Sequence, residues 1–272
     1  MKKVILITGA SSGMGKSTAK VLNDRGHRVY GAARRTERMK DLEEMGIGTI
    51  AMDLTDDGSI VKAVSTIVDK EGKIDILINN AGYGSYGAVE DVSIEEAKRQ
   101  FEVNLFGLAR VTQLVLPGMR KQRYGRIVNV SSMGGKIYTP FGAWYHATKH
   151  ALEGWSDCLR LEVKEFGIEV VVVEPGGIKT EWGEIAARHL KETSGNGPYA
   201  DFAIRVARGM EKSYSGNTLT HVDVLGKGIA TAAMVKKPKT RYAMGYMAKP
   251  AIFMRKWLGD RFFDKMIVSQ LK

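Results

Sequence analysis

Residues 8–18 read T-G-A-S-S-G-M-G-K-S-T and follow directly on the apolar run Val4–Thr8. Glycines in such a turn let the backbone approach a phosphate, and the N-terminus of the following helix attracts its charge. One interpretation is a dinucleotide-binding turn, G-x-x-x-G-x-G at 9–15. A second is the phosphate loop of triphosphate-using enzymes, A-x-x-x-x-G-K-S at 10–17, with alanine in place of the first glycine. A third is a turn that only joins a strand to a helix. The turn alone leaves all three open.

Beyond the turn, short β-branched runs alternate with longer amphipathic stretches. The expected strands are Val4–Thr8, Arg28–Ala32, Gly48–Met52, Ile74–Asn79, Arg126–Val130 and Ile168–Glu174. Helical patterns between them include Lys16–Arg25, Ser59–Glu71, Ser93–Met119 and Trp144–Phe166. This alternation predicts an α/β fold of the Rossmann type, a doubly wound parallel sheet with helices on both faces. Such sheets bind ligands at the carboxyl ends of their strands.

The chain of 272 residues is long enough for one large core, and no repeat or linker divides it. We therefore expect a single dinucleotide-binding and catalytic domain over 1–272 with a C-terminal helical extension. Within it, 176–220 is expected to be a substrate or lid region, because the strand–helix pattern loosens there. A loop is expected at 193–199, and Thr220-x-x-Asp223 is typical of a capped helix start. Residues 236–272 are expected to form a basic C-terminal extension.

The formal charge of +11 is concentrated near the C-terminus, where ten basic residues from Lys236 onward accompany only Asp260 and Asp264. No zinc-ligand spacing, RNA-binding aromatic motif or basic zipper accompanies this charge. We therefore expect an enzyme of small molecules, with no nucleic-acid partner and no metal.

The sequence predicts a cytoplasmic protein. Its single cysteine, Cys158, cannot form an internal disulfide, and the helical pattern around it predicts a small buried side chain. The N-terminal apolar run is too short for a signal peptide. No run approaches the roughly 18 apolar residues of a membrane span.

Tyr145-His146-Ala147-Thr148-Lys149 opens one of the predicted helices. Residues four apart share a helix face, so the phenol of Tyr145 and the ammonium of Lys149 can meet one ligand. A nearby ammonium lowers a tyrosine pKa from its usual value of about 10, which makes the phenol a usable acid or base. About one such pair is expected by chance in a chain of this composition, so the alternative is a surface pair.

Three further loops carry small or polar residues where predicted strands end. Ser131-Ser132 ends one strand, Asn79-Asn80-Ala81-Gly82 follows the strand before it, and Pro175-Gly176-Gly177 follows the strand after it. Because the carboxyl ends of parallel strands lie at one edge of the sheet, these loops are expected beside the glycine-rich turn.

These pieces together resemble the short-chain dehydrogenase/reductase family, over at least Lys3 to Thr180. The matching pieces are T-G-A-S-S-G-M-G, N-N-A-G at 79–82, Asn104 in F-E-V-N-L-F-G, Ser132, Tyr145, Lys149 and P-G at 175–176. Ser132 lies thirteen residues before Tyr145, the usual interval in this family. The triphosphate interpretation explains none of these matches.

The resemblance implies hydride transfer between a nicotinamide cofactor and a carbonyl or secondary alcohol. Tyr145 would exchange a proton with the substrate oxygen, and Lys149 would hold the nicotinamide ribose and keep Tyr145 acidic. Ser132 would hydrogen-bond the substrate oxygen, and Asn104 would hold a water in a proton relay. Ser131 does not have the family's interval to Tyr145, and His146 and His150, as helical neighbours of Tyr145, are expected to point elsewhere, so none of these three is expected to be catalytic. The expected cofactor contacts are Gly9, Ser11, Ser12, Gly13, Met14, Gly15, Arg34, Arg35, Asp53, Leu54, Asn80, Ala81, Gly82, Tyr145, Lys149, Pro175, Gly176, Ile178 and Thr180.

The residues after the second predicted strand favour NADP, as NADPH, over NAD. Ala33 stands where an acidic residue would accept hydrogen bonds from the adenosine ribose. Arg34 and Arg35 instead offer guanidinium groups to a 2′-phosphate, and Lys16 could add to them. The alternative is two solvated arginines at a helix start. An NADPH preference favours reduction as the cellular direction.

The resemblance points to a lipophilic ketone or aldehyde as substrate. Candidate pocket residues are Met133, Tyr138, Phe141, Trp144 and Trp182. A non-catalytic dinucleotide-binding sensor is the alternative function, although an intact Ser–Tyr–Lys set argues against it.

Two expectations concern partners. Lys249–Val268 interleaves aromatic and basic residues, so it is either a helix on an anionic membrane surface or a helix packed on its own domain or a partner subunit. The resemblance also implies a homodimer or homotetramer.

Overall fold

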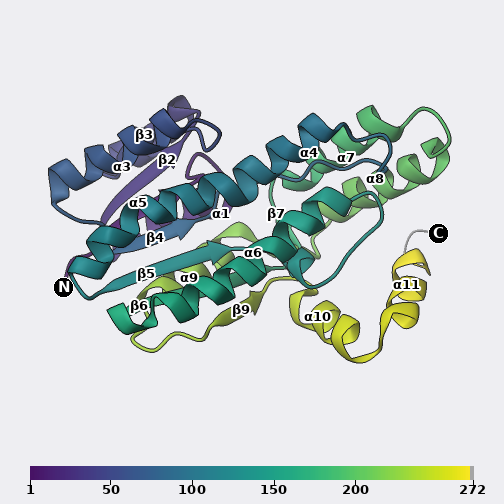
Figure 1. Ribbon diagram of the computed structural model, residues 1–272. Helices are drawn as coiled ribbons and strands as arrows, with labels where there is room; N and C mark the ends of the chain where they lie inside the picture. The colour runs from purple at the N-terminus through teal and green to yellow at the C-terminus, as the bar shows by residue number, and fades with distance from the viewer. Residues whose placement is uncertain (270–272) are drawn as a thin grey trace.

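The computed structural model describes residues 1–269 and contains a seven-stranded sheet in the order β3-β2-β1-β4-β5-β6-β9 (Figure 1). Every neighbouring pair of strands is parallel. The strands are β1 Val4–Thr8, β2 Arg28–Ala33, β3 Gly48–Ala51, β4 Ile76–Asn79, β5 Gly125–Val130, β6 Ile168–Pro175 and β9 Arg241–Met244. The predicted α/β class, with a doubly wound parallel sheet, is confirmed.

The order of strands reverses beside β1, which lies between β2 and β4. In a doubly wound sheet, such a reversal opens a crevice at the carboxyl ends of the two central strands. The Thr8 hydroxyl at the end of β1 accepts hydrogen bonds from the backbone N–H groups of Asn80 and Ala81, each at 3.1 Å. The ends of β1 and β4 are thus tied together at the crevice.

Helices cover both faces of the sheet (Figure 1). One core joins the sheet to α3 Asp57–Glu71, α5 Gly107–Lys121 and α6 Ala143–Glu162, and the other joins it to α1 Gly13–Asp24, α2 Lys40–Glu44 and α9 Val222–Met234. Side chains alternate between the faces, so Ile5 and Ile7 lie in one core and Leu6 in the other. All three are fully buried, and each such side chain stabilises the fold by about 1.5–3 kcal/mol.

A smaller cluster lies beyond the carboxyl edge of the sheet. It is formed by α7 Trp182–Ser194 and α8 Ala200–Ser215, which pack on Tyr86 and Tyr145. Two short strands, β7 Ile178–Lys179 and β8 Thr220–His221, pair beneath these helices. This cluster occupies the segment for which a substrate or lid region is predicted.

The remaining elements are short helical turns, the helix α4 and the two C-terminal helices. They are η1 Thr36–Met39, α4 Ile94–Phe101, the π turn η2 Glu102–Phe106, η3 Met133–Gly135, η4 Lys164–Phe166, α10 Ala248–Trp257 and α11 Asp260–Ser269. Within residues 1–269, no helix combines the length and the apolar character needed to cross a bilayer.

Four local predictions differ from the structure. The helix predicted over 93–119 is interrupted by η2, whose wider turn separates α4 from α5. Strand β9 was not predicted, because it has only four residues, all half-buried, at the edge of the sheet. Cys158 is exposed rather than buried, because the inward face of α6 carries Leu152, Ser156 and Leu159. The cap of α9 is His221 rather than Thr220.

Candidate active site

The three glycines of the first turn serve different purposes. Gly9 has a φ of +68° and Gly13 one of +55°, in the left-handed region that favours glycine. A Cβ on Gly15 would lie 2.4 Å from both the Asn80 amide nitrogen and the Gly9 oxygen. A Cβ on Gly13 would meet nothing within 3.6 Å, its first contact being Thr180 at 3.7 Å. Gly13 therefore faces open space, where a ligand can approach the backbone.

The start of α1 is suited to an anion. Ser12 is its N-terminal cap residue, but the hydroxyl of Ser12 makes no capping hydrogen bond. The first turn contains no acidic residue. Free N–H groups, a free hydroxyl and the helix dipole therefore all favour a phosphate here.

Asn80 links this turn to the end of β4. Its amide nitrogen donates to the carbonyl oxygens of Thr8 at 3.0 Å and Gly9 at 3.2 Å. Its amide oxygen is buried and has no hydrogen-bond partner among the described residues. Because a buried acceptor without a donor is costly, this oxygen fits a ligand that carries hydroxyl groups. Together with the open approach at Gly13, it is compatible with a dinucleotide.

Ser132, Tyr145 and Lys149 meet in a cavity of about 190 Å³ at the carboxyl ends of the strands. Ser132 follows β5, and the other two come from the first turns of α6. The Lys149 amine donates to the Val130 carbonyl oxygen at 3.0 Å, while the Ser132 hydroxyl accepts from the Gly134 N–H at 2.9 Å. The cavity also brings together other predicted contacts, namely Met14, Asn80, Gly82, Pro175, Gly176, Ile178 and Thr180.

The other predicted cofactor contacts do not line this cavity. They are Gly9, Ser11, Ser12, Gly13, Gly15, Arg34, Arg35, Asp53, Leu54 and Ala81, which belong to the loops after β1, β2, β3 and β4 and to the first turn of α1. The predicted contacts thus form two groups, one in the cavity and one along the edge of the sheet. An extended molecule such as a dinucleotide is needed to reach both.

Burial controls the protonation of the two candidate catalytic groups. It raises the pKa of the Tyr145 phenol to about 12, although a hydrogen bond with Ser132 acts to lower it. It lowers the pKa of the Lys149 amine to about 8, although the charge of Glu153 acts to raise it. The expectation that Lys149 lowers the pKa of Tyr145 is therefore wrong for this structure, because desolvation dominates. Tyr145 is protonated at neutral pH and can act as a proton donor.

Asn104 lies beside this group but does not line the cavity. It is fully buried in the π turn η2. Its amide oxygen accepts from the Tyr83 N–H at 3.0 Å, and its amide nitrogen donates to the Tyr83 oxygen at 2.9 Å and the Thr148 hydroxyl at 3.1 Å. Asn104 therefore fixes the loop after β4 against α6, next to Lys149.

His146 lies in the cavity wall, although the sequence predicts that it points elsewhere. Its Nε2 accepts from the Thr139 N–H at 3.0 Å, so the proton lies on Nδ1, which donates to the Gly134 oxygen at 2.9 Å. Burial lowers the pKa of His146 to about 4. Both ring nitrogens are engaged, so His146 is suited to shaping the wall rather than moving a proton.

Aromatic side chains from distant parts of the chain close the cavity around Tyr145. Its ring centroid lies 5.2 Å from that of Trp182 and 6.0 Å from that of Tyr86, and Trp182 is 6.4 Å from Tyr214. Tyr86 and Tyr214 were not predicted, because no local motif surrounds them. Of the candidate pocket residues, Met133 and Trp182 line the cavity, whereas Tyr138, Phe141 and Trp144 do not.

Two exposed arginines lie at the end of β2. Arg34 and Arg35 make no ion pair within residues 1–269. Burial acts to raise the pKa of nearby Asp53, but hydrogen bonds from Thr55 and the charge of Arg34 lower it. The amine of Lys16 pairs with Asp41 at 2.7 Å, and its contribution to a 2′-phosphate site stays a prediction.

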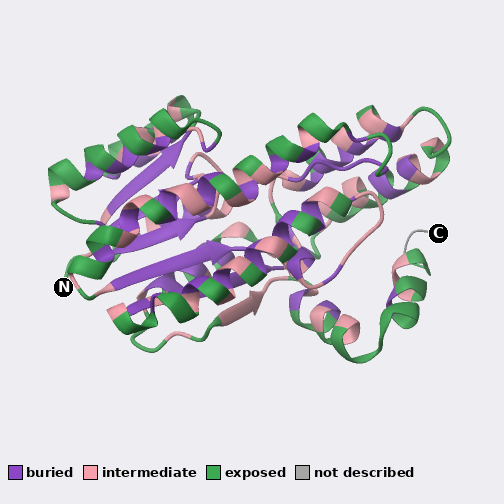
Figure 2. Ribbon diagram, viewed as in Figure 1, coloured by how far each residue is buried: buried purple, intermediate pink, exposed green. Residues whose placement is uncertain are grey.

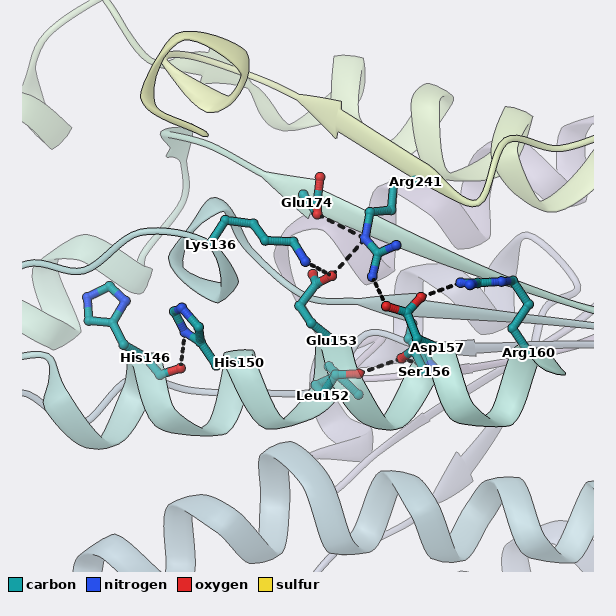
Figure 3. A network of polar contacts seen from close by, with 11 residues as sticks. Lys136, His146, His150, Leu152, Glu153, Ser156, Asp157, Arg160, Glu174 and Arg241 are labelled. Carbon is teal, nitrogen blue, oxygen red and sulfur yellow. Dashed lines mark hydrogen bonds and ion pairs between the residues drawn. The ribbon is translucent and has the colours of Figure 1, made fainter. Parts of the chain in front are cut away.

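A network of charged side chains is centred on Glu153, which follows Lys149 by one turn of α6 (Figure 3). The Glu153 carboxylate accepts from Arg241 and pairs with Lys136, each at 2.9 Å. Glu174, at the end of β6, lies 3.4 Å from the same Arg241 nitrogen. Burial and the charge of Glu153 raise the pKa of Glu174 to about 7. Two buried carboxyl groups thus share one guanidinium, which ties β9 and β6 to α6.

Comparison with known proteins identifies the class to which this fold and site belong. The family model of short chain dehydrogenases matches residues 3–190, so the chain belongs to the short-chain dehydrogenase family. It is 40% identical over 265 residues to a 3-ketodihydrosphingosine reductase of Bacteroides thetaiotaomicron, covering 96% of this chain and 95% of that one. It is 34% identical to an NADPH-dependent 3-dehydrocapnine reductase of Ornithobacterium rhinotracheale, covering 98% and 96%.

Solved structures agree with this assignment. A short-chain dehydrogenase from Streptomyces avermitilis superposes with a TM-score of 0.81 at 34% identity, covering 93% of this chain and 92% of that one. A serine dehydrogenase complexed with NADP+ has a TM-score of 0.78 at 24% identity, covering 89% and 94%, and shows that the fold is the same. The resemblance stated from the sequence is confirmed, and the chain is an oxidoreductase of this family.

Proposed function

We propose that this protein is an NADPH-dependent reductase of a lipophilic ketone or aldehyde. One observation carries the proposal: a buried, protonated Tyr145 lies beside Ser132 and Lys149 in a cavity walled by Trp182 and Tyr86. A proton donor in an apolar pocket suits the reduction of a carbonyl group on an apolar molecule. Two relatives are named for the reduction of a keto or dehydro compound, which supports the same direction.

In this proposal, the bound NADPH supplies a hydride to the carbonyl carbon. Tyr145 donates its phenolic proton to the carbonyl oxygen as negative charge develops there, and the Ser132 hydroxyl hydrogen-bonds to the same oxygen. Lys149, whose amine donates to the Val130 carbonyl oxygen, would hold the hydroxyl groups of the nicotinamide ribose. Asn104 keeps the loop that contains Gly82 in place through its two hydrogen bonds with the backbone of Tyr83.

The preference for NADPH rests on Arg34 and Arg35. Both are exposed directly after β2, and Ala33, at the end of that strand, carries no carboxylate to repel a 2′-phosphate. The name of the relative from Ornithobacterium includes NADPH dependence, which supports the assignment. In the same proposal, the adenosine end of the cofactor lies along Asp53 and Leu54.

The test is NADPH consumption by the purified protein with a panel of carbonyl compounds. The panel contains 3-ketodihydrosphingosine, 3-dehydrocapnine, a medium-chain ketone and a short water-soluble ketone. We expect turnover that increases with chain length, is faster with NADPH than with NADH, and falls at least a thousandfold in Tyr145→Phe. The matched control is Tyr124→Phe, which should retain full activity, because Tyr124 directly precedes β5, at the opposite end of that strand from the cavity.

The alternative, a dinucleotide-binding sensor, gives a different result in the same assay. Such a protein would bind NADPH with quenching of tryptophan fluorescence but would turn over no member of the panel. Binding of ATP in place of either dinucleotide would instead favour a triphosphate enzyme. A homodimer or homotetramer in the cytoplasm also remains part of the proposal, and light scattering of the purified protein tests the assembly.

A further inference from the structure

The outer surface of the C-terminal helices carries an unusual group of exposed apolar side chains. We call it the outer face of α10–α11. Figure 2 shows α11 largely exposed and α10 with buried, intermediate and exposed residues, at the end of the molecule away from β3. The group and its exposed fractions are Phe253 58%, Trp257 65%, Leu258 46%, Phe262 49% and Val268 46%. Scattered apolar residues on a surface need no explanation, but a group on two neighbouring helices in which the rings of Phe253 and Trp257 lie side by side marks a candidate interaction site.

The helices that present this face are firmly attached on their inner side. Phe263 of α11 is fully buried, and its ring lies 5.3 Å from that of Tyr138 in an edge-to-face arrangement. Ala251 of α10 packs in the same cluster against Ile137. A left-handed turn at Gly259, with φ of +75°, joins the two helices. The inner side thus accounts for only part of the apolar residues, and the outer face remains uncovered.

The acidic residues around the outer face have partners among the described residues, whereas most of its basic residues have no acidic partner there. The two acidic residues are both engaged, Asp260 with Arg255 at 2.5 Å and Asp264 with the Tyr138 hydroxyl at 2.8 Å. The exposed basic residues have no acidic partner within residues 1–269; they are Lys249, Lys256, Arg261 and Lys265. The surface that remains for a partner is therefore strongly positive.

Aromatic and basic groups are interleaved on this surface. The rings of Phe253 and Trp257 lie one helical turn apart, with centroids separated by 6.5 Å. The Lys256 amine lies 5.0 Å from the centre of the Trp257 ring. Tryptophan beside lysine and arginine is typical of segments at the boundary between lipid headgroups and acyl chains.

The same helices lie against the wall of the catalytic cavity. Met133 and Ile137 line that cavity, and both belong to the cluster formed by Phe263 and Ala251. The inner side of these helices therefore contacts the cavity wall, and the outer face lies about one helix diameter, roughly 10 Å, from that wall.

We propose that the outer face of α10–α11 docks on an anionic lipid bilayer and that a lipophilic substrate passes from that bilayer to the cavity. The inference rests on the proposed function, because it explains how an apolar substrate reaches a protein with no helix in residues 1–269 that spans a membrane. A second copy of the chain fits this face less well. Two-fold pairing would place its unpaired basic residues opposite one another, and like charges across an interface oppose association.

Sedimentation of the full chain with vesicles tests the docking. The vesicles contain phosphatidylcholine alone or phosphatidylcholine with about one third phosphatidylserine. We expect binding to the anionic vesicles, weaker binding to the neutral ones, and release at high salt, because exposed charges are screened. The double variant Phe253→Ser/Trp257→Ser should partition at least tenfold more weakly. Its matched control, Val89→Ser/Ile94→Ser, removes two side chains exposed by 65% and 53% elsewhere and should bind like the wild type.

A second variant separates charge from apolar contact. Lys256→Gln/Arg261→Gln/Lys265→Gln should lose the preference for anionic vesicles but retain the weak binding to neutral ones. The proposal is overturned if wild-type protein stays in solution with anionic vesicles, or if Phe253→Ser/Trp257→Ser sediments as well as the wild type. Dissociation of an oligomer by that double variant without vesicles would assign the face to subunit contact instead.

Activity measurements distinguish failure of the docking from failure of the proposed function. All variants of the outer face should reduce a short water-soluble ketone with unchanged kcat and KM, because none of these residues lines the cavity. With a long-chain ketone in anionic vesicles, only the outer-face variants should lose rate, by about tenfold. Absence of turnover with every ketone would refute the reductase, whereas equal rates from vesicles would refute the docking alone.

Discussion

Glu174→Gln isolates the energetic role of the buried carboxyl pair behind Lys149. Glu174 is only 4% exposed, and burial together with the charge of Glu153 raises its pKa from 4.5 to about 7. The folded protein therefore holds a proton that the unfolded chain releases between these two values. Glutamine has nearly the same shape as the protonated carboxyl group and can donate to Glu153, but it cannot ionise.

The sign and size of the effect follow from linkage. Because the folded pKa lies above the unfolded one, Glu174 lowers the free energy of unfolding progressively as pH rises from about 4.5 to about 7. Between pH 5 and pH 7 this loss amounts to about 2 kcal/mol, and little further loss occurs above pH 8. His146 acts in the opposite direction, because its pKa falls from 6.5 to about 4 on folding, so its contribution grows over part of the same range. The contribution of Glu174 is therefore separated from that of His146 only by comparing the free energies of unfolding of the wild type and Glu174→Gln.

Urea unfolding of the wild type and Glu174→Gln at pH 5, 6, 7 and 8, followed by tryptophan fluorescence, measures this difference. We expect the two proteins to be about equally stable at pH 5 and the variant to be about 2 kcal/mol more stable at pH 7 and above. Glu162→Gln, at an exposed position near the end of α6, controls for loss of a charge and should show no such pH dependence. Parallel curves for the wild type and Glu174→Gln would refute the assignment of a raised pKa.

Four further changes test other parts of the structure. Gly15→Ala would place a methyl group 2.4 Å from a backbone oxygen, so we expect a lower Tm and loss of NADPH quenching in a fluorescence titration. Arg34→Ala and Arg35→Ala should each raise the Kd for NADPH about 10- to 100-fold by titration and leave that for NADH unchanged, since one charged hydrogen bond contributes about 1.5–3 kcal/mol. Asn104→Ala removes three hydrogen bonds from a buried loop, and we expect about 1–3 kcal/mol lower stability by urea unfolding and a lower kcat. Phe263→Ala should cost about 3–5 kcal/mol locally and make α11 the first site of limited proteolysis.

Local sequence patterns determined the class of fold and most of the residues at the candidate site. The glycine turn, the alternation of strands and helices, and the four-residue interval from Tyr145 to Lys149 are short-range features. The glycine turn predicts a left-handed backbone, the alternation predicts buried parallel strands, and the interval predicts two side chains on one face of a helix. Their predicted positions accordingly agree with the structure to within a few residues.

The tertiary structure alone decided the features that depend on burial by distant segments. Tyr214 reaches the cavity because α8 packs with α7 beyond the carboxyl edge of the sheet, and Arg241 meets Glu153 because β9 adds a strand beside β6. The pKa of Tyr145 moves upward rather than downward for the same reason, since α7 and α8 exclude water from its ring. Desolvation of a side chain depends on many residues that are distant in the sequence, so the spacing of a local motif cannot predict it. The sequence by itself therefore determined which groups could do the chemistry. The tertiary structure determined the pKa values of those groups, because it decides how far each one is buried.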